Sequence, residues 1–162
     1  MVDFHGYELP MWYSSIQEEH LATRNSAGIF DVSHMGNLRF IGDEVRSWLS
    51  SVSTQDYSKF EPGKCGYSHF LDGDGKIIDD IIFAVSTDSE VLGVPNSSMV
   101  GVVLKWLTKN LPKDGSVKIE DLSNETSIIA LQGPKSPEII VDILGDNNVV
   151  ERFGFQKILD NL

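Results

Sequence analysis

Two adjacent carboxylates, Asp79 and Asp80, interrupt the apolar run GKIIDDIIFAV at residues 75–85. The rest of this run has the composition of a buried β-strand. An ionised carboxylate that leaves water without a partner is costly, so the inward-facing acid needs a polar partner or a ligand. Because successive side chains of a strand point to opposite faces, the two acids cannot share one pocket. This geometry excludes a shared-proton dyad and disfavours a two-carboxylate glycosidase site.

A second interpretation of the pair needs no ligand. Both acids could lie where the strand leaves the sheet, one bound by backbone N–H groups and the other in water. The residue types alone leave both interpretations open.

Other reactive side chains do not form a recognisable site. The four histidines, of which we expect His34 to be structural, show no metal-ligand spacing with Asp or Cys, so no metal is expected. The single cysteine, Cys65, excludes an internal disulfide and suits a reducing compartment. No glycine pattern has the strand–turn–helix setting of a nucleotide-binding loop.

Composition limits the class of partner. The chain has 162 residues, of which 41% are hydrophobic and 23% charged, as in ordinary globular proteins. Its net charge of −11 argues against nucleic acid, whose binding depends on clustered Lys and Arg. No apolar stretch is long enough to span a membrane, and the N-terminus lacks the layout of a secretory signal. We therefore expect a cytoplasmic protein with no nucleic-acid or membrane partner.

Capping signals predict two helices outside the middle of the chain. Ser15 followed by Glu18 fits a capping box for a helix from Ile16 to about Arg24. Ser136 is expected to cap a helix that has proline at its first position and ends at Gly145. A strand is expected at 127–131, and the stretch from residue 151 to the end begins like a strand without an evident partner.

Hydrophobic periodicity predicts a β-α-β-β-β-α-β unit between residues 37 and 121. The Asp-Gly-Asp-Gly sequence at 72–75 is rich in residues that tolerate positive φ and predicts a hairpin turn. Asp43 is the expected N-cap of the first helix. The order resembles a ferredoxin-like arrangement, α+β with antiparallel strands and helices on one face. The expected strands are 37–41, 66–71, 77–85, 90–94 and 117–121, and the expected helices are 45–52 and 96–110.

Five stretches of the sequence together resemble one known family. MVDFHGYELPMWY, RNSAGIFDVSHMGNL, GYSHFLDGDGKIIDD, VPNSSM and IALQGP occur in the order and at the spacing of the aminomethyltransferases, the T-protein of the glycine cleavage system. The resemblance implies an α+β fold with antiparallel sheets, packed helices and a ferredoxin-like middle subdomain at 37–122. Residues 1–36 would begin a discontinuous first subdomain, and 123–162 would return to it. Family members are longer, so the chain is expected to be their first, incomplete part.

The resemblance also implies an activity. Family members transfer a one-carbon unit from the aminomethyl group on the lipoyl arm of H-protein to tetrahydrofolate, their co-substrate, and release ammonia. Two alternatives share the folate site: a tetrahydrofolate-dependent demethylase with another donor, and a folate-binding module without turnover. A carboxylate kept at the catalytic position disfavours the pure binding module.

Matched by position, Asp80 corresponds to the family's catalytic aspartate beside folate N10, and Asp79 would be structural or solvated. Tyr67 and Asn96 resemble folate-contacting positions. Met35 would lie near the pterin or benzoyl part, and Val94 would contribute backbone groups. Without the resemblance, Tyr67 and Met35 could equally be packing residues, and Asn96 could cap the helix that follows it.

Overall fold

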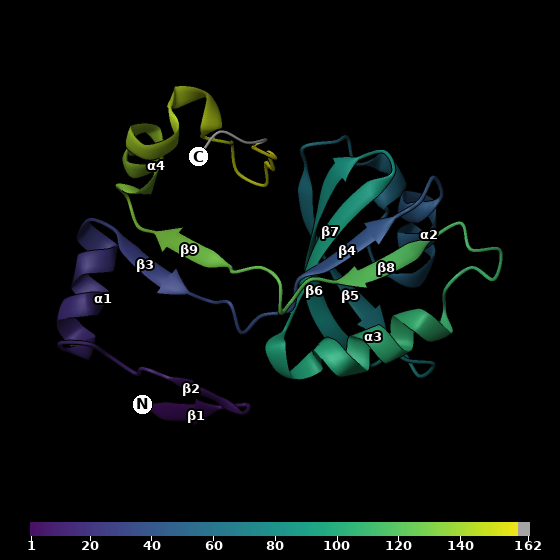
Figure 1. The fold of residues 1–162 in the computed structure, drawn as a ribbon, viewed down its shortest axis with the longest axis horizontal. Helices are drawn as coiled ribbons and strands as arrows, with labels where there is room; N and C mark the ends of the chain where they lie inside the picture. Colours follow the sequence, from purple (N-terminus) through teal and green to yellow (C-terminus); the bar gives the residue numbers. More distant parts are fainter. Residues whose placement is uncertain (159–162) are drawn as a thin grey trace. The chain divides into compact units, whose positions relative to one another are not determined.

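The computed structural model describes residues 1–158 and forms two compact units (Figure 1). Unit 1 contains residues 1–34 and 127–149, and unit 2 contains residues 35–126 with the segment that begins at Val150. Every paired strand is antiparallel, and the helices are short. The expected α+β class with antiparallel sheets is therefore confirmed.

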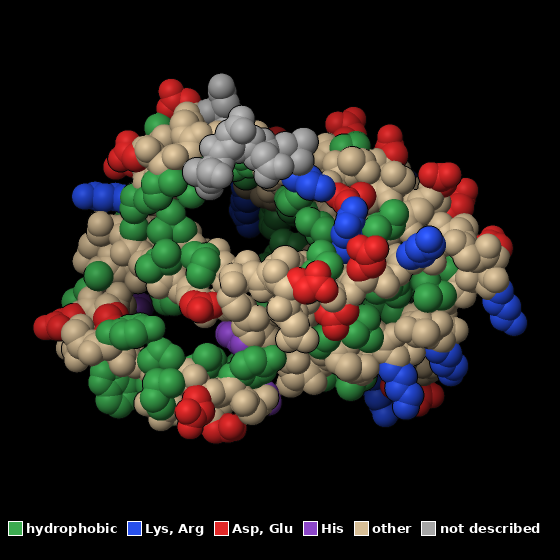
Figure 2. Space-filling model, in the orientation of Figure 1, with side chains coloured by type: hydrophobic (Ala, Val, Ile, Leu, Met, Phe, Trp, Pro, Cys, Tyr) green, Lys and Arg blue, Asp and Glu red, His purple; other side chains and the backbone are tan. Residues whose placement is uncertain are grey.

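Unit 1 holds two small two-stranded sheets, two α-helices and one short 3-10 helix, the type of helix labelled η. Strand β1 pairs with β2, and β3 pairs with β9, which lies far along the chain. None of its residues with an assigned burial is buried, and large apolar side chains are exposed on its elements (green in Figure 2). The elements are β1 (Val2–Phe4), β2 (Tyr7–Leu9), α1 (Ile16–Asn25), β3 (Gly28–Asp31), β9 (Ile129–Gln132), α4 (Ser136–Leu144) and η3 (Asp146–Asn148).

The helix caps of unit 1 agree only in part with the sequence. Ser15 caps α1 as expected, because its Oγ accepts a hydrogen bond from the Glu18 backbone N–H at 3.3 Å. The reciprocal carboxylate is Glu19 rather than Glu18, and it accepts the backbone N–H of Ser15 at 3.2 Å. The expected Ser136 cap is wrong: Lys135 occupies that position without a side-chain bond, and the Ser136 hydroxyl donates to the Gly133 carbonyl.

Unit 2 contains the expected β-α-β-β-β-α-β order. Its strands form one sheet in the order β5-β6-β7-β4-β8, with every neighbouring pair antiparallel. The elements are β4 (Leu38–Ile41), α2 (Val45–Val52), η1 (Tyr57–Lys59), β5 (Cys65–Leu71), β6 (Ile77–Thr87), β7 (Glu90–Pro95), η2 (Ser97–Met99), α3 (Val100–Lys109) and β8 (Lys118–Asp121).

Helices α2 and α3 pack against the same face of this sheet. Their apolar stripes recur at helical spacing, so each helix buries one side against alternate residues of the strands. Glu44, not the expected Asp43, is the N-cap of α2, and it makes no side-chain cap bond. The buried apolar core is Leu38, Phe40, Val45, Trp48, Leu49, Tyr57, Phe70, Ile81, Phe83, Val85, Val91, Val103, Leu107 and Val117.

The segment from Val150 to Ile158 packs with unit 2. The Cys65 N–H donates to the Phe153 carbonyl at 2.8 Å, and the Phe155 N–H donates to the Gly63 carbonyl at 2.7 Å. This segment therefore has a β-bridge partner on the β5 side of unit 2, which its sequence does not reveal. It groups with unit 2, whereas the resemblance implied that 123–162 return to the first subdomain; that division into subdomains stays a prediction. The rest of that expected stretch, residues 159–162, lies outside the described residues.

Across residues 1–158, no helix has both the length and the apolar character that crossing a membrane requires. The acidic side chains lie at many separate points of the face shown in Figure 2. On this face the negative charge is therefore dispersed rather than concentrated in one patch.

Candidate functional site

The two adjacent acids of β6 lie in opposite environments. Asp79 is only 5% exposed and lies on the helix-covered face, in phase with Ile81 and Phe83. Asp80 is exposed on the other, open face of the sheet. Strand alternation therefore separates the carboxylates as the sequence predicted, and only Asp80 can meet a ligand on the open face.

Strand register brings three more candidate residues close to Asp80. Ile82, the next residue of β6 on the open face, is paired with Tyr67 on β5 and with Val94 on β7. Asn96 follows directly after β7, whose last residue, Pro95, is paired with Ile81. The hairpin and the next strand thus place these residues on one part of unit 2, although they are far apart in sequence.

Met35 begins unit 2 near the same end of β7. The N–H of the next residue, Gly36, donates to the Pro95 carbonyl at 3.1 Å. Gly36 has no room for a side chain, because a Cβ atom there would lie 2.6 Å from Pro95 Cγ and 2.7 Å from Val100 Cγ2. The absence of a side chain at this position lets the Met35 backbone approach the turn that carries Asn96.

The Asn96 amide connects the two acids. Its Nδ2 donates to Asp79 Oδ1 at 2.8 Å and to Asp80 Oδ1 at 3.1 Å, and its backbone N–H donates to Asp79 Oδ2 at 3.2 Å. Asn96 precedes η2 but makes no side-chain cap bond to it. Its side chain therefore serves the carboxylates rather than the following helix, and Asp79 has the polar partner that its burial requires.

Tyr67 is 59% exposed, and its ring meets Phe153 of the 150–158 segment edge to face. The ring centroids are 6.2 Å apart at an interplanar angle of 89°. An exposed aromatic ring held in this way offers an apolar surface to a flat ligand.

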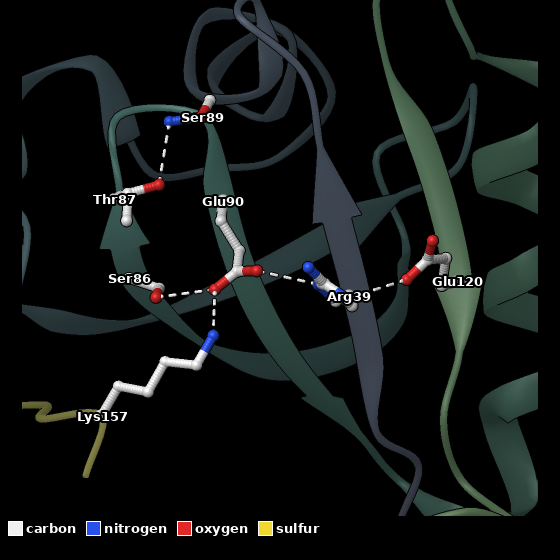
Figure 3. Close-up of polar contacts among 7 residues, drawn as sticks. All are labelled: Arg39, Ser86, Thr87, Ser89, Glu90, Glu120 and Lys157. Atoms are coloured by element: carbon white, nitrogen blue, oxygen red, sulfur yellow. Dashed lines mark hydrogen bonds and ion pairs between the residues drawn. The ribbon is translucent and has the colours of Figure 1, made fainter. Parts of the chain in front are cut away.

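A charge network lies farther along the open face (Figure 3). Arg39 contacts Glu90 at 2.8 Å and Glu120 at 3.3 Å, and Glu90 also accepts from Ser86 and Lys157. These partners, the Ser86 hydroxyl foremost, hold the pKa of the Glu90 carboxyl below its ordinary value. Because Arg39 is bound on both sides, it is not a free cation for an anionic ligand.

His34 packs its ring against Phe4 at a centroid distance of 5.6 Å. Its Nδ1 is buried and finds no hydrogen-bond partner among residues 1–158. In the same part of the chain, no group of three or more His, Cys, Asp or Glu side chains could hold a metal ion.

The chemistry available around Asp80 on the open face is that of one carboxylate beside apolar and aromatic surface. Such a group can stabilise developing positive charge and accept a proton. The Asp79–Asn96 contact was not found from the sequence, because the two residues are 17 positions apart and meet only through the β6–β7 register. A buried acid followed one strand later by an Asn at the strand end is the signal that could have suggested it.

Comparison with known proteins supports a family assignment. The sequence profile of the GCVT N-terminal domain matches residues 1–160. An aminomethyltransferase from Oceanobacillus iheyensis is 38% identical to this chain, over 99% of this chain and 43% of the relative's own length. An aminomethyltransferase from Thermotoga maritima is 37% identical, over 97% of this chain and 43% of the relative's own length.

A solved structure is also similar. The crystal structure of glycine cleavage system aminomethyltransferase T from Bartonella henselae aligns with a TM-score of 0.82 at 28% identity, over 87% of this chain and 38% of that one. The chain therefore spans less than half the length of the curated relatives it matches. From the profile match, the relatives and the shared fold together, this chain belongs to the GCVT N-terminal domain family.

Proposed function

We propose that this chain carries the folate-binding face and the catalytic carboxylate of an aminomethyltransferase of the glycine cleavage system. Tetrahydrofolate is the co-substrate, and lipoylated H-protein delivers the aminomethyl group. The observation that carries the proposal is the exposed Asp80 carboxylate, held by the Asn96 amide on the open face of the sheet. Tyr67 and Val94 flank it across the neighbouring strands.

In this mechanism Asp80 acts by charge and by proton transfer. Ammonia leaves the S–CH2–NH3+ group as folate N5 bonds to the carbon and loses its proton, and departure of the lipoyl sulfur as a thiol then leaves a cationic N5=CH2+ iminium that a nearby carboxylate stabilises. As folate N10 attacks this carbon, the same carboxylate accepts the N10 proton when it lies within about 3 Å. Tyr67 and Val94, with Met35 nearby, would orient the folate, and orientation alone contributes several kcal/mol to barrier reduction.

The single cysteine, Cys65, suits a reducing compartment such as the cytoplasm. Cys65 is a free thiol whose pKa is raised by burial, so it is poorly suited to act as a nucleophile. Cys65 therefore takes no part in the reaction, and the net charge of −11 disfavours a nucleic-acid partner.

The experiment assays the native gene product that contains these residues, with its length established by intact mass. We expect 5,10-methylenetetrahydrofolate and ammonia to form from aminomethylated H-protein and tetrahydrofolate. Asp80→Asn should lower kcat by about 100-fold or more, because it removes the charge that acts on the transition state.

Asp43→Asn is the matched control, since it makes the same change at an exposed acid of unit 2 and should leave the rate unchanged. Absence of product with the unmodified protein, or equal rates for Asp80→Asn and Asp43→Asn, would overturn the proposal.

A further inference from the structure

The buried carboxylate of Asp79 fixes the orientation of the Asn96 side chain. Asp79 offers only acceptors, and both of its oxygens receive N–H groups of Asn96, at 2.8 Å from Nδ2 and 3.2 Å from the backbone N. An amide turned the other way would place its carbonyl oxygen against the carboxylate. The nitrogen side of the amide must therefore face the two acids.

This orientation determines how Asp80 is held. The same Asn96 Nδ2 reaches Asp80 Oδ1 at 3.1 Å and the Asp80 carbonyl at 3.2 Å. Hydrogen bonds to an ionised acceptor are about twice as strong as neutral ones. A carboxylate on an exposed strand position would otherwise sample more than one staggered χ1 rotamer. The amide thus selects one rotamer of Asp80.

The arrangement also sets which atoms remain for a ligand. Within residues 1–158, Asn96 Oδ1 and Asp80 Oδ2 accept no hydrogen bond from another residue. Both are acceptors, so this end of the open face selects a ligand group that carries N–H donors or positive charge.

We propose that Asp79 is a positioning residue: through the Asn96 amide it orders the Asp80 carboxylate and makes both residues present acceptors to the ligand. The ordering follows from contacts within the chain, and the identity of the ligand rests on the function proposed above. Asp79 does not contact the ligand itself, because it lies on the helix-covered face of the sheet.

The ordering is tested without any ligand. The three-bond couplings of Asp80 Cγ to its own backbone N and C′, measured by NMR, report the χ1 population. We expect one rotamer in the unmodified protein and an average of several in Asp79→Asn and Asn96→Ala. Ser68→Ala is the matched control: it removes another buried polar group from the same face of the sheet, one that does not contact Asn96, and it should keep the single rotamer.

An exchanged pair separates positioning from simple structural support. Asp79→Asn combined with Asn96→Asp reverses donor and acceptor, so a side-chain hydrogen bond between positions 79 and 96 is kept while the N–H directed at Asp80 is replaced by a carboxylate oxygen that repels it. We expect the urea midpoint to recover relative to Asp79→Asn, while the native rotamer of Asp80 stays lost. In the enzyme assay kcat should stay lowered by about 10-fold to 100-fold, with KM for H-protein unchanged.

The two proposals fail in different ways. A single Asp80 rotamer retained in Asp79→Asn, or full recovery of the native Asp80 rotamer in the exchanged pair, would overturn the positioning role whatever the enzyme does. If Asp79→Asn does not fold, Asn96→Ala decides the same question from a partly exposed position. Absence of turnover in the unmodified protein removes the proposed function but leaves the rotamer experiment intact.

Discussion

Asp79 and Asp80 are chemically identical neighbours, yet one is buried among the residues under α2 and α3 and the other is open to a ligand. Their sequence pattern was enough to predict that they face opposite ways, because alternation is a property of any strand. It was not enough to predict the partner of the buried acid. Asn96 is supplied by another strand, and its contact depends on a register that no local pattern encodes.

Gly93 is a second residue whose role appears only in three dimensions. A Cβ atom at this position would lie 2.7 Å from Phe83 Cε1 and 3.0 Å from Phe40 Cε2, and both rings are fully buried. We expect Gly93→Ala to lower the free energy of unfolding by about 1–3 kcal/mol through overpacking. Urea denaturation measures this change.

The control for this prediction is Gly73→Ala in the β5–β6 turn, where a Cβ atom would meet nothing within 4 Å. An equal change in unfolding free energy for the two variants would contradict the packing argument.

At the scale of elements, Glu90 connects four strands with the 150–158 segment. Glu90 is the first residue of β7, and its carboxylate binds Ser86 of β6, Arg39 of β4 and Lys157. Arg39 in turn binds Glu120 of β8. Its side chain is 12% exposed, so these bonds are largely shielded from water. We expect Glu90→Gln to cost about 1–3 kcal/mol of stability at pH 7.

The stability cost of Glu90→Gln should decrease as the pH falls. The folded-state pKa of Glu90 lies below its ordinary value of 4.5, so its contribution is present above that pH and is lost as the pH falls through the folded-state pKa. Urea denaturation at pH 7 and at pH values below 4.5 measures this effect. The difference in the free energy of unfolding between Glu90→Gln and the unmodified protein should be smaller at the lower pH values. Glu120→Gln, at a more exposed carboxylate with one partner, should cost less at pH 7. A difference that grows in acid would contradict the assigned cause.

Most elements were predictable from the sequence, whereas their caps were less so. The helical spacing of Val45, Trp48 and Leu49 and the turn residues at 72–75 each identify an element, because burial of one face leaves a periodic trace. The N-cap of α2 was predicted one residue early, since Asp43 and Glu44 are both acidic and only the backbone angles distinguish them. The partner of the 150–158 segment depends on backbone bonds to Gly63 and Cys65, which leave no trace in side-chain pattern.

At the scale of the whole molecule, the buried core belongs to one unit. Every buried residue among those described lies between residues 36 and 117, in unit 2. Because local stability follows burial, amides of β5, β6 and β7 should exchange with deuterium far more slowly than amides of α1, β3 and β9. Hydrogen exchange followed by mass spectrometry checks this expectation, and similar protection in both units would contradict it.

The β6 sequence IIDDII consists of three doublets, so sliding the strand by one position would still leave an acid and isoleucines on each face. Chemical character alone therefore barely distinguishes the native pairing from its shifted competitor. The asymmetry enters at Phe83–Ala84 and Val85–Ser86: Phe83 and Val85 are fully buried beneath the helices, and the Phe83 ring fills the space that Gly93 leaves. The residues that follow the doublets thus decide which of two identical acids is presented to the outside.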